Sequence, residues 1–314
     1  MTVTTFEKLS PRLTFATRAE VFFMTLLAVL YATDIALSEL RDMPIAWRSY
    51  IVGLFSSLSL LGIGFYIRAV KDAPQIAKII ISFTFYSLFG MAMTMFFQLH
   101  MPRPEPVLDE FLVMTDSWFG YHWPDAVAWV ATIPNLGPFL ETIYTSSFIQ
   151  IFAVLVMLGY LGRFDKLDKM LLTNAVSLLL VFAVWQTFPN LSLSTYHTIP
   201  TAQEIAVNLR TDTLYGQLLL EAATDGFEEV SFFQTLGFVA FPSYHMVMLM
   251  LVVWFSWKTM LFWPIFVASF FMVPGILIHG AHHIADVFGG AIVFFIGVWI
   301  SNQILARVNR VSSA

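Results

Sequence analysis

Long runs of apolar residues, separated by short polar segments, make up most of this chain of 314 residues. A run of roughly 20 apolar residues forms a helix long enough to cross the hydrocarbon core of a bilayer. The predicted transmembrane helices cover residues 20–39, 49–69, 76–99, 139–162, 170–188, 243–257, 261–279 and 284–306. The sixth run is short in apolar residues, so we expect its helix to extend upstream through residues 232–241.

The composition supports a membrane protein and excludes several kinds of chemistry. The chain is 58% hydrophobic and 12% charged, with a mean hydropathy of +0.75, which predicts an all-α, polytopic membrane helix bundle. It has no cysteine, so disulfides, thiol nucleophiles and thiolate metal sites are excluded. No cluster of basic residues suggests a nucleic-acid partner. The polar residues 1–18 lead into a full-length span without a small-residue cleavage site, which predicts a retained anchor.

Basic residues are unevenly shared between the two sides that these spans create. With a cytoplasmic N-terminus, the cytoplasmic side holds twelve of the 16, namely Lys8, Arg12, Arg18, Arg68, Lys71, Lys78, Arg163, Lys166, Lys169, Lys258, Arg307 and Arg310. The opposite side holds Arg41, Arg48, Arg103 and Arg210. Cytoplasmic loops carry the excess of Lys and Arg. Both termini are therefore predicted to be cytoplasmic, and all seven histidines to lie at or beyond the extracytoplasmic (periplasmic or lumenal) face.

Two extracytoplasmic connections are predicted to be more than tethers. Apolar residues of segment 108–119 share one helical face, away from Asp109, Glu110 and Asp116, which predicts a helix lying in the membrane interface. Trp123 and Trp129 follow it and are expected at the level of the lipid headgroups. The second connection, about 189–241, is long enough to be a lid or binding element.

Segment 189–241 also carries a signal for the start of a helix. Thr201 and Glu204 have the spacing of a capping box, in which each side chain accepts a hydrogen bond from a backbone amide of the other residue. A helix is therefore expected to open at this point.

Segment 279–290, HGAHHIADVFGG, places three histidines and an aspartate at the start of the last apolar run. His282 and Asp286 are four residues apart, so on a helix they lie on one face. An aspartate that accepts a hydrogen bond from one imidazole nitrogen fixes the tautomer and leaves the other nitrogen free to attack or bind.

A second segment, FPSYH at 241–245, opens the sixth span on the same predicted side. Pro242 suits the first turn of a helix, Ser243 supplies a hydroxyl, and the free amides of a helix N-terminus favour an anion. Together with His245, these residues suggest a phosphoryl-transfer site. His282 would attack phosphorus, Asp286 would orient the His282 ring, and His245 would protonate the leaving oxygen. No metal or cofactor would be required.

FPSYH and HHIAD resemble two motifs of the type-2 phosphatidic acid phosphatase superfamily. The first family pattern is Pro-Ser-Gly-His, which Pro242, Ser243 and His245 match. The second is Ser-Arg followed by five residues, His, three residues and Asp, and His282 and Asp286 match its end. The bulky Tyr244, the following Gly289-Gly290 and the stretch 103–130 (RPEPVLDEFLVMTDSWFGYHWPDAVAWV) resemble the branch that contains inositol phosphorylceramide synthases. The resemblance covers about residues 100–300.

The resemblance implies a domain organisation. It predicts an N-terminal three-span region at 1–99, whose third span is part of a six-helix phosphatase-like core, a phosphatase or phosphotransferase domain at 100–306, and a cytoplasmic tail at 307–314.

The chain departs from the family pattern at the cations that would hold phosphate. The Ser-Arg pair falls on Gly275 and Ile276, and the lysine of a further family motif falls on Phe96, although the Arg103-Pro104 dipeptide is present. Arginine is the usual bidentate partner of phosphate. We therefore expect Arg103, Arg210 and His279, together with the Ser243 hydroxyl, to bind the substrate.

The residues and the resemblance together imply an integral membrane lipid phosphotransferase that forms a phosphohistidine. It would move a phosphoryl group or phospho-headgroup from a phospholipid donor to a lipid alcohol acceptor. The first alternative is a phosphatase that hydrolyses phosphatidate or isoprenyl (di)phosphate. The second is a non-catalytic lipid-binding or transport protein that lacks the arginines.

A rival interpretation of HGAHH starts from its His-x-x-His-His spacing. This spacing also fits a box of the iron-dependent membrane desaturases, which use several such boxes on the cytoplasmic side. The chain has seven histidines, one box, and that box on the opposite predicted side, so the sequence disfavours this interpretation.

Overall fold

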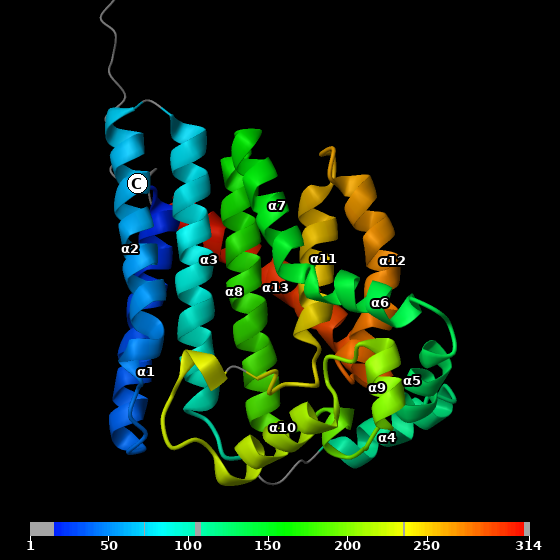
Figure 1. Cartoon of the computed structure of the whole chain (residues 1–314). Helices are drawn as coiled ribbons and strands as arrows, with labels where there is room; N and C mark the ends of the chain where they lie inside the picture. The colour runs from blue at the N-terminus through cyan, green and yellow to red at the C-terminus, as the bar shows by residue number, and fades with distance from the viewer. Residues whose placement is uncertain (1–15, 72, 104–107, 235, 311–314) are drawn as a thin grey trace, which may run out of the picture.

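The protein is a bundle of membrane-length helices, capped at one end by shorter ones (Figure 1). The computed structural model describes residues 16–71, 73–103, 108–234 and 236–310. Within these ranges there is no strand, only an isolated bridge between Ile45 and Val230. The predicted all-α, multi-pass membrane bundle is confirmed. Of the residues used to predict orientation, Lys8 and Arg12 lie outside the described ranges, as does the end of the predicted tail.

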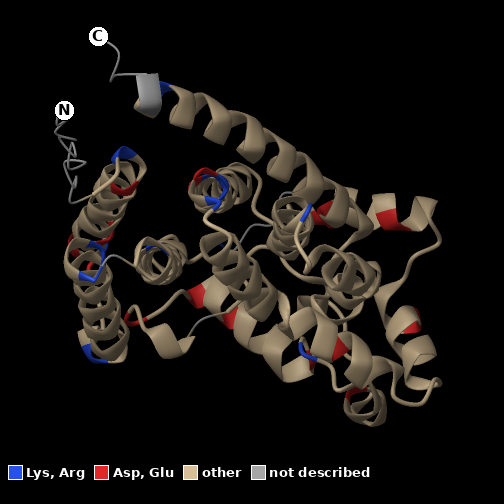
Figure 2. Ribbon diagram, turned by 90° about the horizontal axis from the view of Figure 1, so that it is seen from above, with Lys and Arg blue, Asp and Glu red and all other residues tan. Residues whose placement is uncertain are grey.

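Six helices of the described chain are long and apolar enough to cross a membrane. They match six of the eight predicted spans. Their bounds are α1 (Arg18–Leu40), α2 (Trp47–Val70), α3 (Pro74–Gln98), α8 (Phe164–Thr187), α12 (Phe262–His279) and α13 (Ile284–Arg310). Figure 2 shows α13 running lengthwise along one side of the bundle to the C-terminus, tilted relative to the helices that are seen end-on.

The predicted span 139–162 is broken. It consists of α6 (Leu136–Thr145) and α7 (Ser147–Tyr160), which meet at a 45° bend and count as one span only if taken together. The Ser146 hydroxyl, at the break, does not cap the backbone of α7; it donates to the Ile143 carbonyl and accepts from the Gln150 side chain. The Ser147 hydroxyl donates to the Tyr144 carbonyl. The break turns α6 across the bundle, as Figure 1 shows.

The sixth predicted span is shorter than expected. Helix α11 (Tyr244–Ser256) has 13 residues, and the expected extension through 232–241 is wrong. Pro242 disfavours helical backbone at the preceding residue, and the Ser243 hydroxyl caps the helix by accepting from the Met246 amide. At 1.5 Å per residue α11 is about 20 Å long, against a hydrocarbon core of about 30 Å. Its N-terminus therefore starts well above the lower ends of α3 and α8 (Figure 1).

Four short helices lie across the lower end of the bundle in Figure 1. They are α4 (Asp109–Trp118), α5 (Trp123–Ala131), α9 (Thr201–Val207) and α10 (Thr213–Asp225). The 3-10 turn η1 (Leu193–Thr195) precedes α9, and the 3-10 turn η2 (Phe232–Gln234) lies between α10 and α11. The predicted helix at 108–119 is thus present as α4. Its apolar residues Phe111 and Trp118 are exposed, whereas Asp109 and Asp116 are buried against the protein.

Two local expectations for this end of the bundle are wrong. Trp123 is buried and its indole donates to the Ile278 carbonyl at 3.0 Å, so its ring is covered by protein and does not contact lipid headgroups. Helix α9 does open at Thr201, but without a capping box. The Glu204 carboxylate instead accepts from the backbone and hydroxyl of Thr213, which ties α9 to the start of α10.

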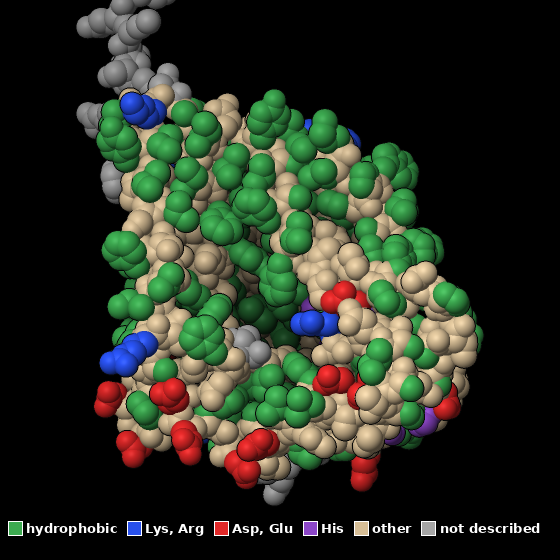
Figure 3. Space-filling view, viewed as in Figure 1, with side chains coloured by type: hydrophobic (Ala, Val, Ile, Leu, Met, Phe, Trp, Pro, Cys, Tyr) green, Lys and Arg blue, Asp and Glu red, His purple; other side chains and the backbone are tan. Residues whose placement is uncertain are grey.

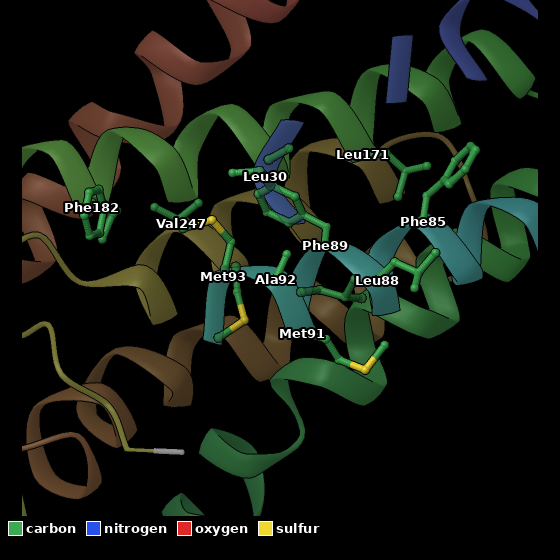
Figure 4. Packing of buried hydrophobic residues seen from close by; sticks show 14 of the residues in the cluster. Leu30, Phe85, Leu88, Phe89, Met91, Ala92, Met93, Leu171, Phe182 and Val247 are labelled. Atoms are coloured by element: carbon green, nitrogen blue, oxygen red, sulfur yellow. The ribbon is translucent and has the colours of Figure 1, made fainter. Parts of the chain in front are cut away.

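Helix α3 lies at the centre of the main hydrophobic core, packed against α1, α2, α7 and α8. Figure 4 shows its side chains meeting residues of α1, α8 and α11; the labelled residues are Leu30, Phe85, Leu88, Phe89, Met91, Ala92, Met93, Leu171, Phe182 and Val247. Flexible methionines and flat phenylalanine rings fill the irregular space between helices.

A buried charge network ties four helices together at the opposite end of the bundle. Glu20 of α1 accepts from Arg68 of α2 at 2.5 and 2.7 Å and from Lys78 of α3 at 2.9 Å, and Lys78 also donates to Asp168 of α8 at 2.6 Å. Because each charge has a partner of opposite sign, their burial is compensated. This network fixes α1 and α2 to α3 and α8.

Candidate active site

The candidate site lies where the N-terminus of α11 meets the start of α13. The Ser243 amide donates to the Asp286 carbonyl at 3.0 Å, which joins the two helix starts directly. A Cβ on Gly290 would collide with the Ser243 carbonyl oxygen, so the glycine permits this close approach. The two segments predicted to share a site therefore do so through their backbones.

His282 is held between a carboxylate and a hydroxyl. Its Nδ1 lies 2.9 Å from Asp286 Oδ2, and its Nε2 lies 3.2 Å from Ser243 Oγ. The same Oδ2 accepts the His283 amide at 2.9 Å. An ionised carboxylate only accepts hydrogen bonds, so it selects the tautomer with the proton on Nδ1. The lone pair is then on Nε2, where the serine hydroxyl donates to it.

His245 lies beside His282, with its ring centroid 6.4 Å away and the two planes at 66°. His245 is in the first turn of α11, so the position at which this short helix begins determines how deep in the bundle the His245 ring lies. A phosphate needs a nitrogen of each ring within hydrogen-bond reach of its oxygens or phosphorus, and this separation permits that. The structure thus brings together Ser243, His245, His282 and Asp286.

A cavity of about 760 Å³ reaches His245. Its lining is mainly apolar and comes from α3, the α6–α7 break, α8, segment 232–239 and α11, with Arg210, Tyr144 and His279 among the polar residues. Figure 3 shows this hollow on the side of the bundle, among hydrophobic side chains.

The predicted phosphate-binding arginines are placed differently. Arg210 lines the cavity, more than half of its side chain is exposed, and its Nε lies 4.0 Å from Glu141 Oε1. Arg103 does not line the cavity. Its guanidinium lies 5.8 Å from the ring centre of Trp185, and its amide donates to the Ala223 carbonyl at 2.6 Å. A role in substrate binding stays a prediction for both.

His279 lines the same cavity but is engaged with the protein. Its Nε2 lies 3.1 Å from the Gly137 carbonyl oxygen, to which it donates, and its Nδ1 is buried without a partner. In this tautomer Nδ1 is an acceptor and gives no proton to a phosphate. Its expected role as a phosphate donor stays a prediction that needs the doubly protonated ring.

A second histidine–aspartate pair, which sequence reasoning missed, lies next to the first. His283 Nδ1 is 2.6 Å from Asp116 Oδ2 of α4, and Asp116 Oδ1 accepts the Ile284 amide at 2.9 Å. Burial lowers the pKa of His283, but the hydrogen bond to Asp116 and the charges of Asp286, Asp116 and Asp109 outweigh it and raise the pKa. Asp116 stood out only as part of an acidic helix; nothing local in the sequence linked it to His283.

The same helix is attached at its other end by Asp109. This carboxylate accepts from the Tyr196 hydroxyl and, at 3.2 Å, from the Leu191 amide. Burial raises the pKa of Asp109, and these two hydrogen bonds oppose the rise. Two aspartates therefore fasten α4 to the segments around the candidate site.

Two tyrosines of the site were also missed. The Tyr244 hydroxyl donates to Asn174 of α8 at 2.8 Å, which fastens the start of α11. The Tyr144 ring of α6 stacks on His245 with centroids 4.2 Å apart. Tyr244 was noted only for its bulk, and Tyr144 sits in an apolar run that carries no signal of a site.

The histidines of the His-x-x-His-His box do not converge on a common point. His279, His282 and His283 bind the Gly137 carbonyl, Asp286 and Asp116, respectively. Among the residues that the structure describes, no group of three or more His, Asp or Glu side chains is arranged to hold a metal ion. The box is built as separate hydrogen-bonded pairs.

Comparison with known proteins adds a family match. The model of the PAP2 superfamily, the type-2 phosphatidic acid phosphatases, matches residues 110–300, which include Ser243, His245, His282 and Asp286. No curated protein and no solved structure matches the chain.

Proposed function

The chain belongs to the PAP2 superfamily, which indicates a phosphatase or phosphotransferase of lipid phosphates, and from this premise we propose that it is an integral membrane lipid phosphotransferase. One observation carries the proposal: His282, oriented by Asp286, lies beside His245, and His245 lines an apolar cavity that opens on the side of the bundle. A lipid can reach this cavity from the bilayer with its chains still in an apolar environment.

In the first half-reaction, His282 Nε2 attacks the phosphorus of the donor. The nitrogen–phosphorus bond forms as the phosphorus–oxygen bond to the leaving lipid alcohol breaks, and His245 gives that oxygen its proton. Asp286 stabilises the positive charge on the His282 ring. The Ser243 hydroxyl leaves Nε2 and donates to a phosphate oxygen, supported by the free amides at the start of α11.

The second half-reaction reverses these roles. His245 takes the proton of the acceptor hydroxyl, whose oxygen attacks phosphorus as the bond to His282 breaks. The burial of His282 and the apolar cavity favour a lipid alcohol over water, because water is excluded from the phosphohistidine. Hydrolysis uses the same residues and differs only in the acceptor.

The donor we propose is a phosphodiester, as in the inositol phosphorylceramide synthase-like branch that FPSYH and segment 103–130 resemble. Such a donor carries less negative charge than a phosphomonoester dianion. That suits a site in which Gly275 and Ile276 replace the family's Ser-Arg pair. Arg210 is the cation that lines the cavity and is proposed to hold the donor there.

We propose that the site faces the extracytoplasmic side and that both termini are cytoplasmic. The excess of Lys and Arg in the opposite loops supports this orientation. Figure 3 adds that acidic side chains gather along the lower end of the bundle, the end that the short helices cover.

The test is turnover of headgroup-labelled phospholipids by purified protein, with and without ceramide or diacylglycerol and with chelator throughout. We expect transfer that depends on the acceptor, lost in His245→Ala and His282→Ala. It should be kept in His122→Ala, an exposed histidine that pairs with Asp125. Release of the phosphorylated headgroup without acceptor would favour the phosphatase. Absence of turnover with every lipid would favour the non-catalytic alternative, and loss on chelation would overturn metal independence.

A further inference from the structure

Helix α6 is held against α12 in a way that presents one side chain to α11. His279 of α12 donates to the Gly137 carbonyl of α6, and a Cβ on Gly275 would lie only 3.2 Å from the Leu140 carbonyl oxygen and 3.4 Å from Tyr144 Cβ. The absence of a side chain at Gly275 therefore lets α6 approach. The position at which the family carries the serine of its Ser-Arg pair is here a contact surface for α6.

Tyr144 fills the space that this approach creates. It packs with Ile276, Met272 and Leu249, in a small hydrophobic cluster next to His245. Its ring lies over the His245 ring with centroids 4.2 Å apart and planes at 24°, and its hydroxyl lies 3.3 Å from His245 Nδ1. One face and one nitrogen of the imidazole are thereby occupied, which leaves Nε2 for a substrate.

This hydrogen bond sets which nitrogen of His245 is left for the substrate. As a general acid, His245 enters the step as an imidazolium with a proton on both nitrogens, because a neutral imidazole that lost its only N–H would become an imidazolate. Nδ1–H then donates to the Tyr144 oxygen, and the proton on Nε2 passes to the leaving alcohol, which leaves a neutral ring.

We propose that Tyr144 is a positioning residue that holds Nδ1–H of His245, so that Nε2 gives its proton to the leaving alcohol and later takes one from the acceptor. The inference rests on the proposed function, since it needs a leaving group to protonate. Both histidines are then held at Nδ1 and act through Nε2: the Asp286 carboxylate holds His282, and the Tyr144 hydroxyl holds His245.

The experiment compares two donors with the same headgroup. One has diacylglycerol as the leaving group, which needs a proton as it departs; the other has 4-nitrophenol, whose anion departs without one. Formation of the phosphoenzyme is measured for wild type, Tyr144→Phe and His245→Ala. Tyr215→Phe is the matched control, because Tyr215 lines the same cavity but its hydroxyl accepts from the Gly237 amide.

We expect Tyr144→Phe to keep the ring stack and to slow the diacylglycerol donor roughly tenfold, the effect of one lost hydrogen bond. The nitrophenyl donor should be nearly unaffected, so the ratio of the two rates rises. His245→Ala should raise it further and Tyr215→Phe should not change it. The ratio is measured within one variant, so loss of folded protein cancels.

Two results would overturn the inference. An unchanged ratio in Tyr144→Phe, with a phosphoenzyme in wild type, would refute the role of Tyr144 and leave the proposed function standing. Absence of a phosphoenzyme in wild type with both donors would refute the proposed function itself, and this inference with it.

Discussion

His282 and His283 are adjacent in the chain, and each is hydrogen-bonded through Nδ1 to an aspartate, yet their surroundings differ. His282 is paired with Asp286 of its own helix start, and its Nε2 meets the Ser243 hydroxyl next to His245. His283 is paired with Asp116 of α4, and its Nε2 is buried without a partner.

The proposed mechanism uses only the first of these pairs, so a histidine–aspartate pair alone would not make a reactive centre. What lies at Nε2 decides its role. A nitrogen that faces a hydroxyl and a second imidazole can exchange its partner for a substrate, whereas a sealed nitrogen cannot. His283–Asp116 is an ion pair that holds α4 against the start of α13, and His282–Asp286 is the proposed nucleophile with its orienting base.

The largest effect should come from breaking the first pair. Asp286→Asn is expected to slow phosphoenzyme formation by about 10²- to 10⁴-fold, because an amide can donate to Nδ1 and so favours the tautomer without a lone pair on Nε2. The measurement is the single-turnover rate with a labelled donor. Asp116→Asn is the matched control. If Asp116→Asn slows the reaction and Asp286→Asn lowers only the stability of the protein, the two roles are reversed.

Asp116→Asn should act on stability instead. It leaves the buried His283 ring without its counter-charge, which costs about 3 kcal/mol of unfolding free energy. Thermal unfolding in detergent measures the loss. The double variant Asp116→Asn, His283→Gln should recover part of it, because no charge is then left buried. Recovery of nothing would mean that the pair contributes through packing alone.

The same pair predicts a dependence of stability on pH. The folded-state pKa of His283 lies above its usual value of 6.5, chiefly through Asp116 after the opposing effect of burial. Its stabilisation is therefore complete below the unfolded pKa and is lost as pH rises through the folded pKa. As pH rises from below 6.5 through the folded-state pKa, the melting temperature of wild type should fall toward that of His283→Gln. A constant difference between the two proteins across this range would contradict the assigned charge.

The smallest effect concerns the two arginines near the site. Arg210 lines the cavity and Arg103 lies over Trp185, so Arg210→Gln should raise the KM for the donor about tenfold, the loss of one charge-assisted contact. Arg103→Gln should change it little. Initial rates against donor concentration distinguish them, and the opposite ranking would place the phosphate on the Arg103 side.

The sequence predicted those features that depend on local periodicity. Apolar runs located the long helices, and the spacing of four between His282 and Asp286 gave their contact directly. The meeting of FPSYH with HHIAD followed from their shared membrane side and the family resemblance. Other contacts between distant segments were not predictable, because a single sequence holds no distances. Asp116 and His283 are 167 residues apart, and Tyr144 and His245 are 101 apart.

Local signals also failed where tertiary contacts competed with them. Trp123 has the amphipathic ring of an interface residue, yet its indole donates a hydrogen bond to the carbonyl of Ile278 inside the protein. Glu204 has capping-box spacing, yet it bonds to Thr213 of the next helix. The extension of α11 was expected from apolar residues alone, although Pro242 and the Ser243 cap already mark the start of that helix.

The central claim is that His282 carries the phosphoryl group while His245 serves as its acid and base. The most direct measurement is to mix the protein with labelled donor and no acceptor, quench it in base, and map the label by mass spectrometry. The account predicts a phosphohistidine at residue 282, absent from His282→Ala and discharged by added lipid alcohol. Label found at residue 245, or a labelled His282 that no acceptor discharges, would contradict it.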